Sequence, residues 1–351
     1  MIAILQPHVP HYREQFFEIL GESEKTDIVC YDLEESKNNN FSEAKIPVVG
    51  IQVFQIGPLL LYNPFQFLQK KYDILILMLH FGHLTTWLLL LTKWIHRKKI
   101  ILWGQGISVK RYLEEEKNPD WKLKWMIALS NGVWIYTEKE AEQWKKLFQK
   151  KPIVALNNTL QCSCNPKPDI AKVERYKNKH HITQKRILLF SARFENPYRR
   201  TDLLLEVINQ LNPDEVGFII IGSGSLKPDF SKYKNVYDFG KLYDEEIKRE
   251  LFSMADIYFQ PGWVGLSIVE AMSSALPIFT FRRNEDIKQC VEYSYIIDKY
   301  NGLLFDNLSE CLDIILHISD DTLMKMGENA RNYVKEKLTV DNMVNNALSM
   351  L

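Results

Sequence analysis

Two loops in the C-terminal half of the chain carry residue types that suit a phosphorylated ligand. The first, residues 191–202, follows an apolar run and contains Arg193, Arg199 and Arg200. Guanidinium groups stay charged and can bind phosphate bidentately, so two or three of them at a strand end suit a diphosphate. The second, residues 222–224, reads Gly-Ser-Gly, where the missing Cβ atoms permit a tight turn or a close backbone approach.

A third loop, residues 261–272, has Gly262 and Gly265 ahead of an expected helix that carries Glu270. Free N–H groups at a helix start can hold phosphate, and a carboxylate one to two turns later can accept hydrogen bonds from ribose hydroxyls. Taken singly, these features have ordinary explanations: a turn, a solvated arginine, a glutamate that interacts with the helix dipole. Their occurrence together, in this order, predicts a site for a nucleoside diphosphate.

The N-terminal half offers less specific candidates. The loop after the first expected strand contains His8, His11 and Arg13. If this loop faces a ligand cleft, either histidine can assist an acceptor hydroxyl; the alternative is that all three are ordinary loop residues, and we weigh the two equally. His80 and His83 bracket another strand end, where a place in the cleft and a satisfied core histidine are also equal alternatives.

Short apolar runs alternate with segments of helical periodicity along the whole chain, which predicts parallel sheets covered by helices. The expected strands are 2–5, 74–79, 100–103, 133–136, 187–190, 216–221, 236–239, 257–260 and 277–281. The fold class is therefore α/β, with two doubly wound Rossmann-like domains that bind ligands beyond the carboxyl ends of their strands. We expect a first domain at 1–165, a second at 166–335, and a final helix at 336–351 that can cross back to the first.

Composition narrows the class of protein. The chain of 351 residues has 44 basic and 44 acidic side chains, so its net charge gives no pull toward nucleic acid. Its five cysteines include no Cys-x-x-Cys pair, which indicates free thiols in a reducing compartment and neither a disulfide framework nor a zinc site. The chain shows no secretory signal, and no apolar run approaches the ~20 residues that span a bilayer. We therefore expect a cytoplasmic protein.

Residues 87–99 are aromatic, then aliphatic, then basic. Such a segment can lie on the inner face of an anionic membrane, as a lipid-linked acceptor would require. The alternative is a core helix followed by a charged turn. The four contiguous leucines favour this alternative, because they are not confined to one helical face.

The second half resembles the nucleotide-binding domain of the family-four retaining glycosyltransferases of GT-B fold. That family shows an arginine followed six positions later by lysine and glycine. It later shows two glutamates separated by seven residues around Gly-Phe-Gly-Leu, the second in Glu-Ala-Met, and then a Pro-Val strand. The matching residues here are Arg193 and Arg199, then Gly265-Leu266, Glu270-Ala271-Met272 and Pro277-Ile278.

The resemblance implies roles for these residues. Arg193 and Arg199 would hold the donor diphosphate during catalysis, Glu270 would bind the ribose, and the amides of Gly265 and Leu266 would bind the distal phosphate. The remaining donor-site candidates are Gly222, Gly262 and Ser267. No Asp-x-Asp motif occurs in the chain, in keeping with a family that uses cationic side chains and a helix terminus where other enzymes use Mg²⁺. The nucleotide sugar is then a substrate, and no cofactor or metal is expected.

The sequence also departs from the family pattern. Arg199 stands in place of the lysine, Arg200 in place of the glycine, and Gly262 in place of the first glutamate. In the first domain, Gln105 occupies a strand end where relatives often carry a histidine that faces the donor sugar. Gln105 can form hydrogen bonds there but cannot act as an acid or base. Enzymes of this kind are thought to need no protein nucleophile, so the resemblance still implies transfer with retention.

The expected activity is transfer of a hexose or N-acetylhexosamine from a nucleotide sugar to a glycan or lipid-linked acceptor, in bacterial surface polysaccharide biosynthesis. One alternative is a sugar-nucleotide epimerase of the same fold, and another is a non-catalytic protein that binds a nucleotide sugar. Gly262 and Gln105 count against the epimerase and favour the binding protein, whereas Arg193, Arg199 and Glu270 argue for the enzyme. An NAD-dependent oxidoreductase is disfavoured, because Gly-x-Gly-x-x-Gly is absent after the first strand.

Overall fold

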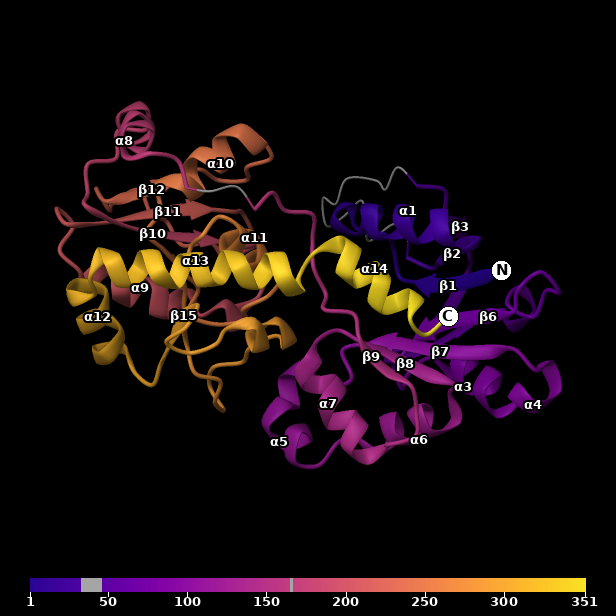
Figure 1. Ribbon diagram of the computed structural model, residues 1–351. Helices are drawn as coiled ribbons and strands as arrows, with labels where there is room; N and C mark the ends of the chain where they lie inside the picture. Colours follow the sequence, from indigo (N-terminus) through magenta and orange to yellow (C-terminus); the bar gives the residue numbers. More distant parts are fainter. Residues whose placement is uncertain (33–45, 165–166) are drawn as a thin grey trace. The chain divides into compact units, whose positions relative to one another are not determined.

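The computed structural model describes residues 1–32, 46–164 and 167–351. The chain forms two compact units, and Figure 1 shows a sheet with covering helices in each. Unit 1 comprises Met1–Gln161 together with Thr339–Leu351, and unit 2 comprises Cys162–Leu338. The boundary that we expected between residues 165 and 166 lies outside the described residues. The predicted fold class, two doubly wound α/β domains, is confirmed.

A seven-stranded sheet forms the centre of unit 1, in the order β3-β2-β1-β6-β7-β8-β9, and all its pairs are parallel. Its central strands are nearly continuous runs of Ile, Leu and Val, because both faces of the sheet are covered. The strands are β1 (Ile2–Gln6), β2 (Thr26–Cys30), β3 (Val49–Gly50), β6 (Ile74–Met78), β7 (Lys99–Gly104), β8 (Gly132–Ile135) and β9 (Ile153–Ala155).

Helices cover both faces of this sheet. One face buries apolar side chains of α3 (Leu84–Leu91), α6 (Trp121–Leu129) and α7 (Glu138–Leu147). The other buries side chains of α1 (Glu14–Ser23) and α14 (Val340–Leu348). Unit 1 also contains α4 (Lys93–His96) and α5 (Tyr112–Lys117). The last helix of the chain therefore completes the core of unit 1.

A β-hairpin that the sequence did not predict lies against α3. It consists of β4 (Val53–Ile56) and β5 (Leu59–Tyr62), which pair antiparallel, with Gly57 at φ +55° in the turn. The Tyr62 N–H donates to Thr85 Oγ1 (2.9 Å), and Thr85 Oγ1 donates to the Tyr62 carbonyl (2.8 Å). These reciprocal bonds attach the hairpin to the first turn of α3.

Unit 2 contains a six-stranded parallel sheet in the order β12-β11-β10-β13-β14-β15. Figure 1 shows α8 and α10 on the opposite side of this sheet from α9 and α12. The strands are β10 (Arg186–Ser191), β11 (Val216–Ile221), β12 (Val236–Asp238), β13 (Ile257–Phe259), β14 (Ile278–Phe281) and β15 (Gly302–Phe305). The helices are α8 (Ile170–Lys179), α9 (Thr201–Gln210), α10 (Glu245–Met254), α11 (Ser267–Ser273), α12 (Leu308–His317) and α13 (Asp320–Lys337).

The strand orders fix where a ligand can bind. In unit 2 the order reverses between β10 and β13, and in unit 1 it reverses between β1 and β6. In open α/β sheets the crevice outside the carboxyl ends of the strands at such a switch point is the usual ligand site. The loops after β10 and β13 are two of the three that the sequence singled out.

Residues 84–96 form two helices, α3 and α4, separated at Thr92. Thr92 Oγ1 donates to the Leu88 carbonyl (2.7 Å), a back-bond that tends to bend helices. Arg97, at φ +59°, ends α4 before β7 begins. Within the described part of the chain, no helix is both long and apolar enough to cross a bilayer.

Candidate nucleotide-sugar site

Arg199 lies at the switch point of unit 2. It ends a short 3-10 helix, Pro197–Arg199, in the loop between β10 and α9. Its Nη1 donates to the carbonyl of Trp263, in the loop after β13 (3.2 Å). The two loops that flank the switch point are therefore linked through this guanidinium.

The environment of Arg199 is unusual for a cation. Among the described residues, no Asp or Glu forms an ion pair with it, and its Nε is buried without a hydrogen-bond partner. Burial lowers the pKa of the guanidinium, and the positive charge of Arg193 lowers it further. A buried cation without a counter-ion is costly, so Arg199 is suited to receive an anion.

The residues next to Arg199 form a stacked aromatic pair. The rings of Tyr198 and Trp263 lie with centroids 5.1 Å apart and an interplanar angle of 19°. Trp263 has φ +52°, a backbone conformation that bulky residues rarely adopt. Its N–H donates to the Lys288 carbonyl (2.8 Å), which helps to hold that conformation. This pair could not be predicted from the sequence, because nothing in a linear pattern predicts which aromatic rings will meet.

Two fully buried glutamines brace the loop after β13. Gln260 Nε2 donates to the carbonyls of Gly262 (3.1 Å) and Trp263 (2.8 Å). Gln289 Oε1 accepts from the Val264 N–H (2.8 Å), and its Nε2 donates to the Phe281 carbonyl (2.9 Å). Both side chains are 0% exposed. The loop is thus rigid before any ligand arrives, and sequence reasoning missed both residues.

The two glycines of this loop differ in the space around them. A Cβ added to Gly262 would lie 2.5 Å from the Tyr198 carbonyl oxygen and 2.9 Å from Arg200 Cγ. A Cβ on Gly265 would meet nothing closer than Cys290 Sγ, at 4.0 Å. A glutamate in place of Gly262 would therefore need the Tyr198 loop to move, which gives the departure from the family pattern a physical reason.

Gly222 and Gly224 follow β11 and lie against the backbone of the first loop. A Cβ on Gly222 would lie 1.9 Å from the Ala192 carbonyl oxygen, and one on Gly224 would lie 2.5 Å from the Phe194 backbone. Both have strongly positive φ, +134° and +151°. The Gly222 N–H donates to the Gly240 carbonyl (2.7 Å). These glycines therefore shape the loop that carries Arg193.

Glu270 has a cationic partner that the sequence did not reveal. It lies in α11, and Lys248 Nζ of α10 is 2.6 Å from its Oε1. The Lys248 and Glu270 side chains are only 21% and 24% exposed. Burial raises the pKa of Glu270 while Lys248 opposes the rise. Burial disfavours the charged form of Lys248, but the attraction of the Glu270 carboxylate is stronger than this effect. The pKa of Lys248 is therefore raised.

The helix that carries Glu270 is short. α11 has seven residues, Ser267–Ser273, and begins after Leu266 without a side-chain cap. Ser267 Oγ donates to Gln260 Oε1 (3.3 Å), so the helix start is tied to the same buried amide that braces the loop. The cationic side chains, more than the helix terminus, supply the positive charge of this region.

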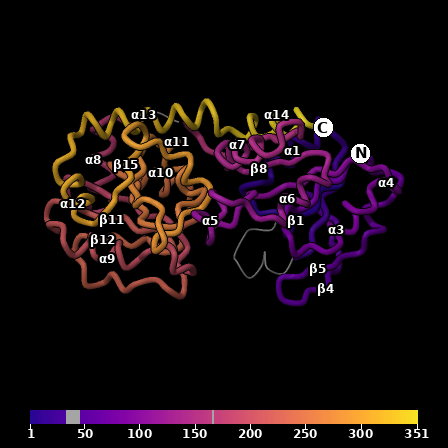
Figure 2. Tube along the Cα trace, turned by 90° about the horizontal axis from the view of Figure 1, so that it is seen from below, coloured from indigo at the N-terminus to yellow at the C-terminus, as the bar shows by residue number. Residues whose placement is uncertain are grey.

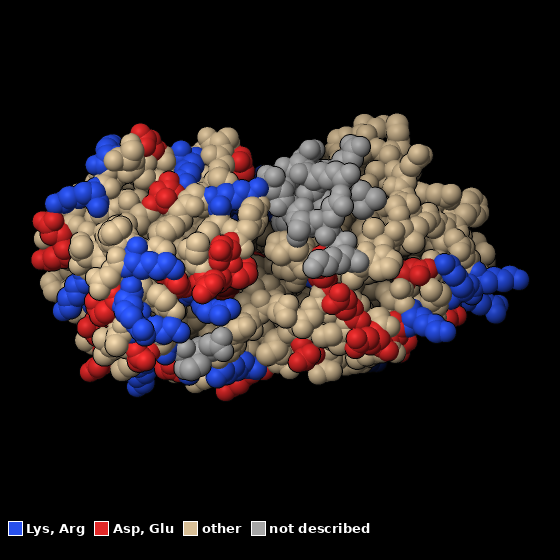
Figure 3. All heavy atoms as spheres, turned by 90° about the horizontal axis from the view of Figure 1, so that it is seen from above, with Lys and Arg blue, Asp and Glu red and all other residues tan. Residues whose placement is uncertain are grey.

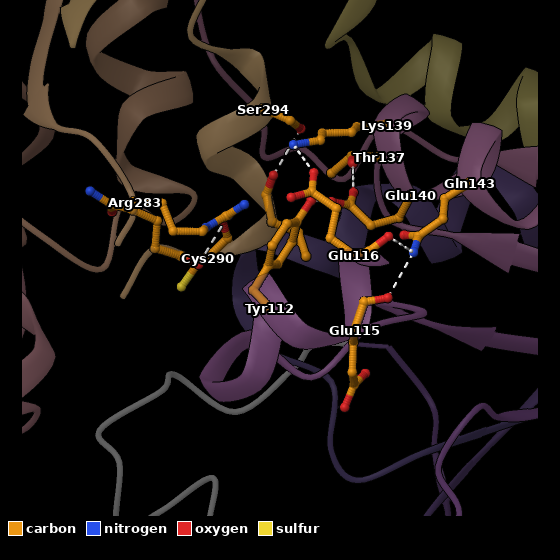
Figure 4. A network of polar contacts seen from close by, with 12 residues as sticks. Tyr112, Glu115, Glu116, Thr137, Lys139, Glu140, Gln143, Arg283, Cys290 and Ser294 are labelled. Atoms are coloured by element: carbon orange, nitrogen blue, oxygen red, sulfur yellow. Dashed lines mark hydrogen bonds and ion pairs between the residues drawn. The ribbon is translucent and has the colours of Figure 1, made fainter. Parts of the chain in front are cut away.

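In unit 1, Gln105 follows β7 and is half-buried. A buried polar network supports its loop, and Figure 4 shows Tyr112, Thr137 and Glu140 pointing toward one another. The hydroxyls of Tyr112 and Thr137 both donate to the fully buried Glu140 carboxylate. Trp144 Nε1 of the same helix donates to the Gly106 carbonyl (2.8 Å), next to Gln105.

The acceptor candidates His8, His11 and Arg13 follow β1 at the switch point of unit 1, but their surroundings differ. His8 is half-buried and His11 is exposed. Arg13 is 5% exposed and its guanidinium carbon lies 4.8 Å from the centroid of Trp103. Its Nη2 donates to Asn158 Oδ1 (2.5 Å). Arg13 therefore organises the end of the sheet, while the two histidines lie nearer the surface.

His80 and His83 lie after β6, on the other side of the same switch point. His83 is 5% exposed and its ring contacts those of Tyr31 and His80, with centroid distances of 5.7 and 5.2 Å. Burial, and then the neighbouring His80, lower the pKa of His83 to about 4. The structure buries His83, and its Nδ1 has no hydrogen-bond partner among the described residues. Among the described residues, no three His, Cys, Asp or Glu side chains gather into a metal-binding group.

Comparison with known proteins shows which family model and which folds this chain resembles. Residues 185–321 match the family model described as Glycosyl transferases group 1. No curated protein matches the sequence. The chain is similar to the crystal structure of Anabaena HepE in complex with UDP, with a TM-score of 0.69 and 14% identity over 100% of this chain and 99% of that one.

Two further structures share the fold. The lipopolysaccharide outer core galactosyltransferase WaaB matches with a TM-score of 0.67 and 14% identity, over 100% of this chain and 99% of that chain. A glycosyltransferase from Rickettsia africae matches with a TM-score of 0.63 and 15% identity, over 99% and 96%. The resemblance drawn from the sequence is thereby confirmed: the chain has the GT-B fold, and its residues 185–321 match the model of the group 1 glycosyl transferases.

Proposed function

We propose that this protein is a glycosyltransferase that moves a sugar from a nucleotide-sugar donor to a glycan or lipid-linked acceptor, with retention and without a divalent metal. The observation that carries the proposal is the Arg199 guanidinium. It lies at the switch point of unit 2, inside the family segment, with a buried Nε that has no partner among the described residues. A donor diphosphate supplies the anion that this position requires.

Arg193 and Arg199 act on the leaving group. Negative charge develops on the donor diphosphate as its bond to the sugar breaks. Cations already fixed near that charge stabilise it without reorganising at the moment of reaction. Arginine remains protonated even with a lowered pKa, because its ordinary value lies far above neutrality. These two side chains therefore do the work for which other enzymes use a metal ion.

The nucleoside is held beside Lys248 and Glu270. Lys248 fixes Oε1 of the carboxylate, and Oε2 accepts hydrogen bonds from the ribose hydroxyls. The amides of Gly265 and Leu266, with Ser267, bind the distal phosphate. The space beside Gly265 leaves room for it. Gly262 and Gly222 set the course of the surrounding loops.

Unit 1 provides the acceptor side in this proposal. Gln105 contributes hydrogen bonds to the sugar that is transferred, and His8 or His11 assists the acceptor hydroxyl. Arg13 has a positioning role, because it is buried against Trp103 and bonded to Asn158.

Retention rests on the family resemblance, and proton NMR of the product's anomeric centre tests it directly. An epimerase would instead return a nucleotide sugar with an inverted ring carbon in the absence of acceptor.

The first test identifies the donor and the metal requirement. A thermal-shift panel of UDP-, GDP-, ADP- and dTDP-sugars should show one nucleotide class that raises the melting temperature, because a ligand of the folded state stabilises it. Turnover of that donor, by transfer or slow hydrolysis, should continue in excess EDTA. Loss of activity in EDTA with rescue by Mn²⁺ would contradict the metal-independent mechanism, and a flat panel would contradict the donor site itself.

The second test addresses Arg199. Each charge-assisted bond is worth roughly 1.5–3 kcal/mol, so Arg199→Ala should lower kcat/KM for the donor by on the order of tenfold to a hundredfold. Arg199→Lys should keep much of the activity, since it restores the charge. Arg175→Ala, at an exposed arginine of α8, is the matched control and should behave as wild type. Unchanged donor kinetics in Arg199→Ala would remove the residue from the site.

A further inference from the structure

One surface of unit 1 exposes many large apolar side chains. It is formed by the β4–β5 hairpin, α3, α4 and α6, and we call it the α3–α6 surface. Its most prominent side chains are Trp94, Trp121 and Trp125, which are 78%, 62% and 59% exposed, and Phe54 and Ile56, which are 63% and 62% exposed. α3 contacts both α6 and β5. Figure 2 looks onto this side of unit 1, where α6, α3 and the hairpin follow one another.

The exposure follows from how each element is anchored. In α6, Leu123 and Met126 enter the core, so Trp121 and Trp125, one helical turn apart, point outward. In the hairpin, Leu60 is buried, so Leu59 and Leu61 lie on the outer face together with their cross-strand partners Ile56 and Phe54. A surface that only met water would carry polar side chains at these positions, and large contiguous apolar patches mark interaction sites.

The charge of this surface is uniformly positive. Residues 53–62, 84–98 and 121–129 contain no Asp or Glu, and their basic residues are Lys93, Arg97, Lys98, Lys122 and Lys124. Figure 3 views unit 1 from the side opposite to Figure 2, and there both acidic and basic side chains occur. Lys122 Nζ lies 4.6 Å from the Phe81 ring centroid, so its charge stays next to the aromatic groups.

We propose that the α3–α6 surface docks this protein peripherally on an anionic lipid bilayer. Tryptophan rings favour the boundary between headgroups and acyl chains, and lysine and arginine side chains beside them attract anionic lipids. A second copy of the chain is a poorer occupant, because a symmetric interface would bring the like charges of Arg97, Lys122 and Lys124 together. The inference stands apart from the donor site, since every residue in it belongs to unit 1.

Vesicle sedimentation tests the proposal with the intact protein. Vesicles of phosphatidylcholine with phosphatidylglycerol should bind it at low salt and release it at high salt. Pure phosphatidylcholine vesicles should bind it much more weakly. Binding should also shift the tryptophan fluorescence to shorter wavelength. Equal binding to both vesicle types, or none to either, would overturn the proposal.

Two sets of variants separate the apolar from the charged contribution. Trp94→Ser with Trp121→Ser and Trp125→Ser should weaken binding by on the order of tenfold per lost ring. The matched control is Ile170→Ser with Tyr243→Ser and Met324→Ser, three side chains of unit 2 that are 83%, 64% and 64% exposed. These control substitutions should leave vesicle binding unchanged.

Charge reversal gives the second set. Arg97→Glu with Lys124→Glu should weaken binding by at least about fivefold per reversed charge, whereas Arg175→Glu with Lys232→Glu, at exposed positions of unit 2, should not. All variants should keep the donor-induced thermal shift, which shows that they are folded. Wild-type binding by the tryptophan variant would overturn the proposal. So would a dimer in light scattering that Trp94→Ser dissociates, because the surface would then be an interface between copies.

Discussion

Glu270 can be explained in two ways, and its ion pair with Lys248 sharpens the choice between them. A carboxylate that serves only to neutralise Lys248 stabilises unit 2 and has no effect on a ligand. A carboxylate that also binds ribose affects both. The 2.6 Å contact between Lys248 Nζ and Glu270 Oε1 is compatible with either role, so the difference must be measured on the nucleotide.

Glu270→Gln should lower affinity for a ribonucleoside diphosphate by roughly 1.5–3 kcal/mol per lost charge-assisted bond. It should also lower stability somewhat, because Lys248 loses its partner. Lys248→Met is the companion variant, since it breaks the same ion pair while it keeps the carboxylate. Calorimetry with the ribo- and 2′-deoxyribonucleotides distinguishes the roles: the deoxy analogue should lose less on Glu270→Gln. Equal nucleotide affinity in wild type and Glu270→Gln would show that Glu270 only neutralises Lys248 and does not bind ribose.

The loop between β13 and α11 is a preformed element, and its two glycines test that directly. Gly262→Ala forces a Cβ to within 2.5 Å of the Tyr198 carbonyl oxygen, so it should cost about 1–3 kcal/mol of stability, as overpacking does, and should lower donor turnover. Gly265→Ala has room, with its nearest neighbour at 4.0 Å, and should change stability by about 0.5 kcal/mol or less. Urea unfolding of both variants checks the contrast. Equal destabilisation would mean that backbone conformation, and not the close approach to Tyr198, decides the cost.

The elements also show what a single sequence can and cannot predict. The strands β1, β10 and β11 were predicted because buried parallel strands are continuous apolar runs. The β4–β5 hairpin was missed because its outer face is itself apolar at Phe54 and Ile56, which removes the alternation that marks a half-buried strand. The loop of Arg199 was found from its composition.

The partners of that site were not predictable in the same way. Gln289 and Lys248 reach the site from separate segments, and only the folded chain brings Gln289 to the loop after β13 and Lys248 to α11. A local pattern carries no information about such contacts. The roles of Arg193, Arg199 and Glu270 themselves stay predictions until nucleotide binding is measured.

His83 is buried beside Tyr31 and His80, which makes unit 1 sensitive to acid. The folded pKa of His83 is lowered from 6.5 to about 4. Between these values the unfolded chain binds a proton that the folded chain does not, so stability is complete above about pH 6.5 and falls as the pH drops toward 4. The loss should approach roughly 3 kcal/mol. His83→Phe should flatten this dependence in urea unfolding, and His317→Phe, at a histidine whose side chain is 74% exposed, should not. A slope that persists in His83→Phe would assign the effect to other groups.

Two helices near the C-terminus, α13 and α14, belong to different units. α13 contributes Met326 to the core of unit 2, where it is 7% exposed, and α14 contributes Met343 to the core of unit 1, where it is 2% exposed. Met324, also on α13, is 64% exposed. These three methionines lie within twenty positions of one another. Met326 belongs to the core of unit 2, Met343 belongs to the core of unit 1, and Met324 belongs to neither core.

This arrangement predicts that the two units can be destabilised separately. Met343→Ala and Met326→Ala should each cost about 2–5 kcal/mol, and Met324→Ala should be close to neutral. In scanning calorimetry the nucleotide should raise only the transition of unit 2, because a ligand stabilises the unit that binds it. Met326→Ala should lower that ligand-sensitive transition, while Met343→Ala should lower the other one and leave nucleotide affinity intact. A single transition that both variants shift equally would show instead that the units unfold as one cooperative body, and the donor site would then depend on the core of unit 1 as much as on its own.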